Sequence, residues 1–171
     1  MRHMKARSKE LLDRSIAAMV AAIDVYNKPD FPYRAESFTI LALNSWELLL
    51  KAKWLADHDN RMSSLYVPEK GSKKRTTYKR TRSGNRQTHS SDYLIKKLVE
   101  TKALDENARR NLEALTELRD TSVHFYHRSG TLAEILQELG MACLKNFVSA
   151  GMSGLVNTYR NSIFILCRFH L

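Results

Sequence analysis

The stretch from residue 34 to residue 58 constrains the fold most, because its pattern predicts a helix that is apolar on most sides. A surface helix carries one apolar stripe, whereas a helix that is apolar on several sides needs neighbours around it. We therefore expect this helix to lie at the centre of an all-α bundle. The residues of one stripe are Phe38, Leu41, Leu48, Ala52 and Leu55, and those on the remaining sides are Ile40, Leu43, Trp46, Leu50 and Trp54.

Apolar residues at helical spacing predict further helices on both sides of the central one. These helices cover residues 7–27, 91–99, 105–128 and 131–147. Ser91 and Asp105 are the expected N-caps of two of them. The last helix follows a break at residues 129–130, and Thr131 and Glu134 have the spacing of a capping box. The sequence thus predicts a bundle of four to five helices.

Length and composition indicate a single domain spanning residues 1–171. A chain of 171 residues with 43% hydrophobic residues can form one core but is short for two. It has no apolar run of about 18 residues and no secretory signal, so a cytoplasmic location is expected. Cys143 and Cys167 lie in apolar helical contexts without CxxC spacing. Two buried thiols are therefore expected, and neither a disulfide nor a zinc site.

The net charge of +10 is concentrated between the second and third predicted helices. A cluster of this kind attracts phosphate backbones, although a solvated insertion carries the same composition. Within residues 60–90, segments 64–67 and 76–81 could pair as a short β-hairpin, and Tyr66 and Tyr78 could stack on bases. The cations expected to bind RNA are Lys70, Lys73, Lys74, Arg75, Lys79, Arg80, Arg82 and Arg86.

A cluster of polar residues marks the end of the helix predicted over 105–128. Leu115 and Leu118 belong to the stripe that should face the core, whereas Asp120 and His124 fall nearly opposite. Arg119 and His124 are five positions apart, which separates them by roughly 140° around a straight helix. One protomer therefore cannot easily bind a small group with both side chains. Either the helix unwinds there or two copies combine.

Two charged residues on the central helix also require an explanation. Glu47 and Lys51 sit one turn apart, so they can form an ion pair that only stabilises the helix. The same two residues can instead support a functional site.

The Arg119-Asp120-x3-His124 pattern and the Glu47-x3-Lys51 pair, on helices in this order, resemble the HEPN domain family. Members of that family are small helical bundles found in prokaryotic toxin and phage-defence systems and in some RNA-processing enzymes. The motif covers six residues, and the looser pattern of helices covers most of the chain. The resemblance implies an HEPN-like bundle with a basic insertion between its second and third helices.

The resemblance further implies an endoribonuclease or RNase toxin that requires no metal and no cofactor. In this chemistry the ribose 2′-OH attacks the adjacent phosphate and leaves a 2′,3′-cyclic phosphate and a 5′-OH. His124 would act as general base or acid, Arg119 would stabilise the phosphorane charge, and Asp120 would orient the imidazole. Glu47, Lys51, Tyr126 and His127 are supporting candidates. The resemblance also implies a homodimer whose two motifs form one composite site.

Other interpretations of the same residues stay open. His124, His127 and Arg128 could be no more than cations placed favourably at a helix C-terminus. Asp120 with the two histidines could bind a metal, although more ligands would be needed. Tyr126 completes an Arg-x4-His-x-Tyr pattern, which in one HEPN branch is adenylylated by a partner nucleotidyltransferase antitoxin. A module of the same fold that binds RNA or protein without catalysis is the competing functional class.

Overall fold

The computed structural model describes residues 6–69, 77–124 and 129–155, with the backbone alone for residues 6, 122–124, 129–134 and 152–155. The described residues form five α-helices, a short 3₁₀ helix and no strand, so the fold is all-α. The 3₁₀ helix η1 (Met62–Leu65) lies between α2 and α3. The α-helices are α1 (Ala6–Asn27), α2 (Arg34–Asp57), α3 (Ser91–Glu100), α4 (Glu106–His124) and α5 (Ser129–Leu155).

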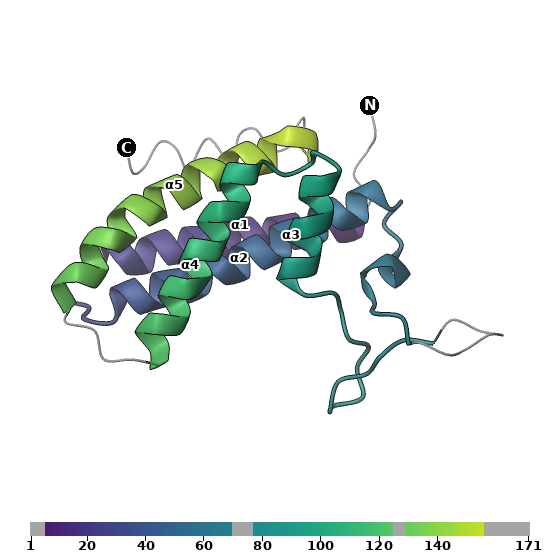
Figure 1. Ribbon diagram of the computed structural model, residues 1–171, viewed down its shortest axis with the longest axis horizontal. Helices are drawn as coiled ribbons and strands as arrows, with labels where there is room; N and C mark the ends of the chain where they lie inside the picture. The colour runs from purple at the N-terminus through teal and green to yellow at the C-terminus, as the bar shows by residue number, and fades with distance from the viewer. Residues whose placement is uncertain (1–5, 70–76, 125–128, 156–171) are drawn as a thin grey trace.

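Helix α2 is the central helix, as the sequence predicts. It contacts α1, α3, α4, α5 and η1. Figure 1 shows α1 and α2 side by side at the back, α5 along one edge, and α3 and α4 in front, diverging from each other. The chain between α2 and α3 projects away from the helices. Between α3 and α4, α2 has an uncovered side on which Ile40 and Asn44 are exposed.

Small side chains allow α1 and α2 to approach closely. Ser15 and Ser45 are fully buried, and each hydroxyl donates to the other residue's carbonyl oxygen at 2.7 Å. The predicted stripe of α2 is therefore wrong in part. Leu41 and Leu48 of that stripe are only half-buried, and Ile40, expected on another apolar side, is 43% exposed. The face turned to α1 instead carries Ala42, Ser45, Leu49 and Ala52, all fully buried.

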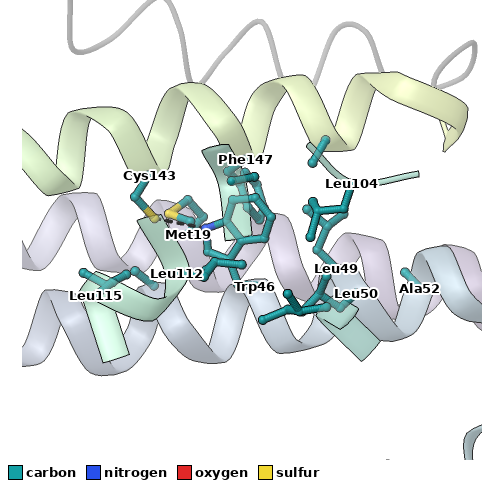
Figure 2. Close-up of a cluster of buried hydrophobic side chains, with 14 of the residues drawn as sticks. Met19, Trp46, Leu49, Leu50, Ala52, Leu104, Leu112, Leu115, Cys143 and Phe147 are labelled. Carbon is teal, nitrogen blue, oxygen red and sulfur yellow. Dashed lines mark hydrogen bonds between the residues drawn. The ribbon is translucent and has the colours of Figure 1, made fainter. Parts of the chain in front are cut away.

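The core forms where α2, α4 and α5 meet (Figure 2). Trp46 packs edge-on against Phe147 with ring centroids 5.5 Å apart, and its indole Nε1 donates to Cys143 Sγ at 3.0 Å. Burial raises the pKa of the Cys143 thiol to about 12, an effect that this hydrogen bond partly offsets. Cys143 is therefore a buried thiol, as expected, whereas Cys167 lies outside the described residues.

Two of the predicted helix starts need correction. The N-cap of α3 is Ser90, whose extended backbone lets its Oγ accept from Tyr93 N at 3.3 Å. Ser91, the predicted cap, is already helical. Helix α5 begins at Ser129, so the expected break and the box beginning at Thr131 lie inside it. A glycine costs a helix only about 0.5–1 kcal/mol, which the packing of a long helix outweighs. The Asp105 cap is confirmed, since its Oδ1 accepts from Asn107 N at 2.6 Å.

A buried lysine joins α2 to α5. Lys53 is only 4% exposed, and its Nζ donates to Ala150 O at 3.1 Å. Burial lowers the pKa of this amine, and the charge of Asp57 opposes that shift. No sequence pattern predicted a lysine in this place.

Lys53 should make stability depend on alkaline pH. Because its pKa is lower in the folded than in the unfolded chain, the unfolded chain binds more protons between the two values. This group's contribution to the free energy of unfolding should thus increase as pH rises toward 10.5, the ordinary lysine value. In urea unfolding at pH 7 to 10.5, the free energy of unfolding of wild type should increase relative to that of Lys53→Met as pH rises. A constant difference between the two proteins would contradict the assignment.

Candidate functional site

A groove of about 600 Å³ lies between α2, α3 and α4, on the uncovered side of α2. Its apolar lining includes Ile40, Leu43 and Leu50 from α2, Ile95 from α3 and Leu112 from α4. Its polar lining includes residues that the sequence singled out and others that it did not. The polar lining residues are Asn44, Glu47, Ser91, Asp92, Glu113, Thr116, Glu117 and Arg119.

Arg119 is the link between the predicted motif and this groove. It lines the groove on α4 and is partly exposed, with 40% of its side chain accessible. Its Nε donates to Asp120 Oδ1 at 2.9 Å, and its Nη2 lies 2.7 Å from the same oxygen. Asp120 therefore holds the Arg119 guanidinium, a role that its sequence position did not suggest.

The predicted companions of Arg119 are described only in part. His124 ends α4, and its side chain, like the whole of Tyr126 and His127, lies outside the described residues. The predicted orientation of α4 agrees with the part of the helix that the structure describes, since Leu115 is fully buried and Asp120 is exposed. Asp120 as an orienting group for the imidazole, and the supporting roles of Tyr126 and His127, stay predictions.

Glu47 and Lys51 do pair on α2. Lys51 Nζ donates to Glu47 Oε1 at 2.5 Å, and Lys51 is the more buried partner, with 16% of its side chain accessible against 43% for Glu47. Glu47 also lines the groove, on the helix opposite Arg119. The ion pair therefore stabilises α2 and at the same time fixes one carboxylate at the groove.

Most of the polar lining of the groove could not be predicted from the sequence. Glu47 and Arg119 stand out from their helices, whereas Asn44, Asp92, Glu113, Thr116 and Glu117 do not. The one available signal was the polar edge of α4, where Glu113 and Glu117 follow the apolar stripe one turn apart. Which helices diverge enough to leave a groove is a property of tertiary packing, so no local pattern encodes it.

The cationic segment between α2 and α3 forms a compact structure, which we call the basic arm (residues 66–69 and 77–88). Three stretches close on one another through backbone hydrogen bonds. Val67 N donates to Gln87 O at 2.9 Å, Gln87 N to Lys79 O at 2.8 Å, and Lys79 N to Val67 O at 2.9 Å. The predicted hairpin between segments 64–67 and 76–81 is not formed as such: an isolated bridge joins Pro68 to Tyr78, and two further bridges join Tyr66 to Thr88 and Arg80 to Arg86. Gly84 makes the last turn with φ +82°.

Two tyrosines and an arginine form the small core of the arm. The rings of Tyr66 and Tyr78 meet edge-on at 5.4 Å, and the Arg86 guanidinium lies 5.2 and 5.4 Å from the two ring centroids. The tyrosines are half-buried in these contacts. The two tyrosines therefore hold the arm together. Stacking on bases, which the sequence suggests, would compete with these contacts inside the arm. Lys79, Arg80, Arg82 and Arg86 are the exposed cations of the arm, and the other four predicted cations, Lys70, Lys73, Lys74 and Arg75, lie outside the described residues.

Stacked aromatic side chains anchor the arm on the bundle. Trp54 stacks on His58 at 4.1 Å and donates through Nε1 to Ser64 O at 3.0 Å. His89 stacks on Tyr93 at 4.0 Å, and partial burial lowers the pKa of His89. The arm therefore leaves the bundle from a fixed base.

Removing Arg86 should loosen the arm. Each cation–π contact at an exposed site contributes roughly 0.5–1 kcal/mol, and Arg86 makes two. Arg86→Ala should therefore accelerate limited tryptic cleavage after Lys79, Arg80 and Arg82 several-fold, measured by mass spectrometry. Arg82→Ala removes an exposed cation without ring contacts and is the matched control, with cleavage after Lys79 and Arg80 compared. Equal cleavage rates in the two variants would show that the ring contacts do not hold the arm.

Among the helices that the structure describes, none is long and apolar enough to cross a membrane. The part of the chain that it describes also holds no group of three or more potential metal ligands.

Comparison with known proteins identifies a family for this chain. No curated protein and no solved structure matches the chain. A family model matches residues 10–163 and carries the description "domain of unknown function", DUF3644. That match runs from the first turns of α1 past the end of α5 and includes the groove and the basic arm. The chain therefore belongs to the DUF3644 family.

Proposed function

We propose that this protein is a metal-independent endoribonuclease with an HEPN-like fold, in which the segment from about residue 60 to 90 is a basic insertion. One observation carries the proposal: Arg119, the first residue of the Arg-Asp-x3-His pattern, opens onto a groove that also holds Glu47. The sequence pattern points to both residues independently of the groove. One residue from each of the two sequence patterns, on α2 and on α4, therefore lines the same groove.

The chemistry that this site supports best is transesterification of RNA. The 2′-oxygen forms a bond to the adjacent phosphorus while the bond from phosphorus to the 5′-oxygen breaks. His124 takes the proton from the 2′-OH or gives one to the leaving 5′-oxygen, since imidazole exchanges protons near neutral pH. Arg119 offers fixed donors to the charge on the phosphorane oxygens. Asp120 holds the Arg119 guanidinium, as its hydrogen bond at 2.9 Å indicates.

We propose that the site is completed in a homodimer. A straight helix separates positions 119 and 124 by roughly 140°, so two copies placed around one phosphate would supply the arginine and the histidine from different chains. The proposal places the protein in the cytoplasm, where RNA is the substrate.

The basic arm would hold the RNA strand without taking part in proton transfer. Phosphate contacts position a strand, and each one adds about 0.7 to the log–log slope of affinity against salt for single strands. Changing Lys79, Arg80 and Arg82 to Gln should therefore lower that slope by about 2, with turnover at saturating RNA unchanged. Filter binding from low to moderate salt measures the slope. An unaltered slope would assign RNA binding to another face.

The direct test of the proposed function is RNA cleavage in EDTA by the purified protein. Structured and single-stranded RNA should yield fragments with 2′,3′-cyclic phosphate and 5′-OH ends, identified by mass spectrometry. Cleavage that requires added metal, or fragments with 5′-phosphate ends, would overturn the proposal.

A non-catalytic module that binds RNA or a protein is the second candidate. It is favoured by one observation: the Arg119 guanidinium is engaged by Asp120, and carboxylates surround it in the groove. Stable RNA binding without products at any protein concentration would support this alternative. An antitoxin, including a nucleotidyltransferase that would adenylylate Tyr126, is the protein partner that the resemblance suggests. Mass spectrometry of Tyr126 after co-expression with a neighbouring nucleotidyltransferase tests that branch.

A further inference from the structure

The groove beside Arg119 has the wrong charge to receive RNA by itself. Its lining carries the carboxylates of Glu47, Asp92, Glu113 and Glu117 against the single guanidinium of Arg119. Glu47 forms an ion pair with Lys51, and Glu113 forms one with Arg109, each within a single helix. Arg119 is itself ion-paired with Asp120. Within the described residues, Asp92 and Glu117 form no ion pair. A phosphate approaching Arg119 therefore meets a negative rim.

The charge that would complement this rim lies on the basic arm. Lys79, Arg80, Arg82 and Arg86 are exposed, and in the described part of the chain none of them is ion-paired with a carboxylate. Arg80 donates to Gly84 O at 2.7 Å, and Arg86 covers the two tyrosine rings. The arm thus presents a fixed, exposed set of cations.

The arm of one chain projects away from the helices that line its own groove. The arm enters α3 beside the groove, since Ser91 and Asp92 at the start of α3 line it. From there the arm projects away from the helices, as Figure 1 shows. An arm that starts beside the groove but points outward can reach the groove of a second copy related by a two-fold axis nearby. Such an exchange would be reciprocal.

We propose that the basic arm of a second copy lies over this groove, with its cations against Asp92 and Glu117. The apolar lining supports a covering partner, because Ile40 is 43% exposed at the groove. The functional consequence rests on the proposed ribonuclease activity: the arm supplied in trans neutralises the rim and makes the surroundings of Arg119 attractive to phosphate. The association itself does not depend on that activity.

Charge exchange between two variants tests the proposal without RNA. The groove variant is Asp92→Lys with Glu117→Lys, and the arm variant is Lys79→Glu with Arg82→Glu. Each variant alone would place like charges together, so its self-association should weaken by more than about tenfold. An equimolar mixture should restore association, because both arm–groove contacts of the mixed dimer again join opposite charges. Sedimentation equilibrium at low salt measures this.

The matched control reverses charges on α5, where Glu138→Lys with Lys145→Glu changes two exposed residues away from the groove. This control should associate like wild type. Wild-type association should weaken as salt rises, because exposed charge pairs are screened. Zero-length crosslinking of a mixture of isotope-labelled and unlabelled protein should join the peptide of Lys79 to that of Asp92 or Glu117 across copies.

A wild-type protein that stays monomeric throughout the micromolar range would overturn the proposal. So would association that survives in both variants, or a mixture that fails to recover. If the groove variant associates normally but binds RNA or a basic peptide differently, that ligand and not the arm occupies the groove. If the mixture recovers association but the protein cleaves no RNA, the arm–groove contact is supported and the ribonuclease proposal is refuted. Failure of one proposal can therefore be told apart from failure of the other.

Discussion

Replacing His124 by alanine is expected to lower the rate of RNA cleavage by about 10²–10⁴-fold, because a positioned general acid or base contributes that much. Arg119→Ala should cost about 10²–10³-fold, the loss typical of one preorganised donor to a transition-state charge. In both variants the loss should fall on turnover at saturating RNA, since the basic arm retains the cations that bind the strand. Single-turnover cleavage of labelled RNA in EDTA measures these rates.

Two further variants separate a catalytic role from loss of positive charge on α4. Arg119→Lys keeps the charge but loses the planar fork, so it should rescue Arg119→Ala only in part. Arg110→Ala removes a cation from the same helix, where Arg110 is 70% exposed, and should leave the rate near wild type. Equal losses of cleavage rate in Arg110→Ala and Arg119→Ala would show that Arg119 contributes only its positive charge.

If two copies supply the two residues, mixing Arg119→Ala with His124→Ala should recover activity. A mixed dimer contains one composite site with both residues intact and one with neither. About a quarter of wild-type activity is then expected if subunits exchange at random, from half of the dimers being mixed and half of their sites active. No recovery would show that each chain acts alone.

The helices could be predicted from the sequence because each buries an apolar stripe with a period near 3.6 residues. The prediction failed where burial does not depend on hydrophobicity. Ser15 and Ser45 are fully buried because they satisfy each other's hydrogen bonds, and this allows α1 and α2 to pack closely. A hydrophobic pattern cannot reveal such a face, so it placed the buried stripe of α2 on Leu48.

The candidate site could be predicted only as separate residues. Arg119 and Glu47 each stood out from their own helix, and their meeting at one groove depends on how α3 and α4 diverge over α2. The closure of the arm was also beyond the sequence. Its backbone hydrogen bonds join residues up to twenty positions apart, and such contacts produce no periodic pattern in the sequence.

The largest effect on stability is expected from Trp46. This side chain is 1% exposed at the meeting point of three helices, as Figure 2 shows. Its ring packs edge-on against Phe147, and its Nε1 donates to Cys143 Sγ, so α2 and α5 are joined by packing and by a hydrogen bond. Truncating a buried tryptophan removes the transfer free energy of the ring and leaves a cavity. Trp46→Ala should therefore lower the free energy of unfolding by about 3–5 kcal/mol.

Urea unfolding followed by circular dichroism measures this loss, and two variants show where it comes from. Trp46→Phe keeps an aromatic ring against Phe147 but removes the Nε1 donor, so it should cost less than Trp46→Ala. Trp54→Ala truncates the same residue type on the same helix, but there the ring is only half-buried and stacks on His58 at the base of the arm. Its cost should be smaller and should appear mainly as faster proteolysis of the arm. Equal losses for Trp46→Ala and Trp54→Ala would mean that the junction with α5 is no more central to the fold than the base of the arm.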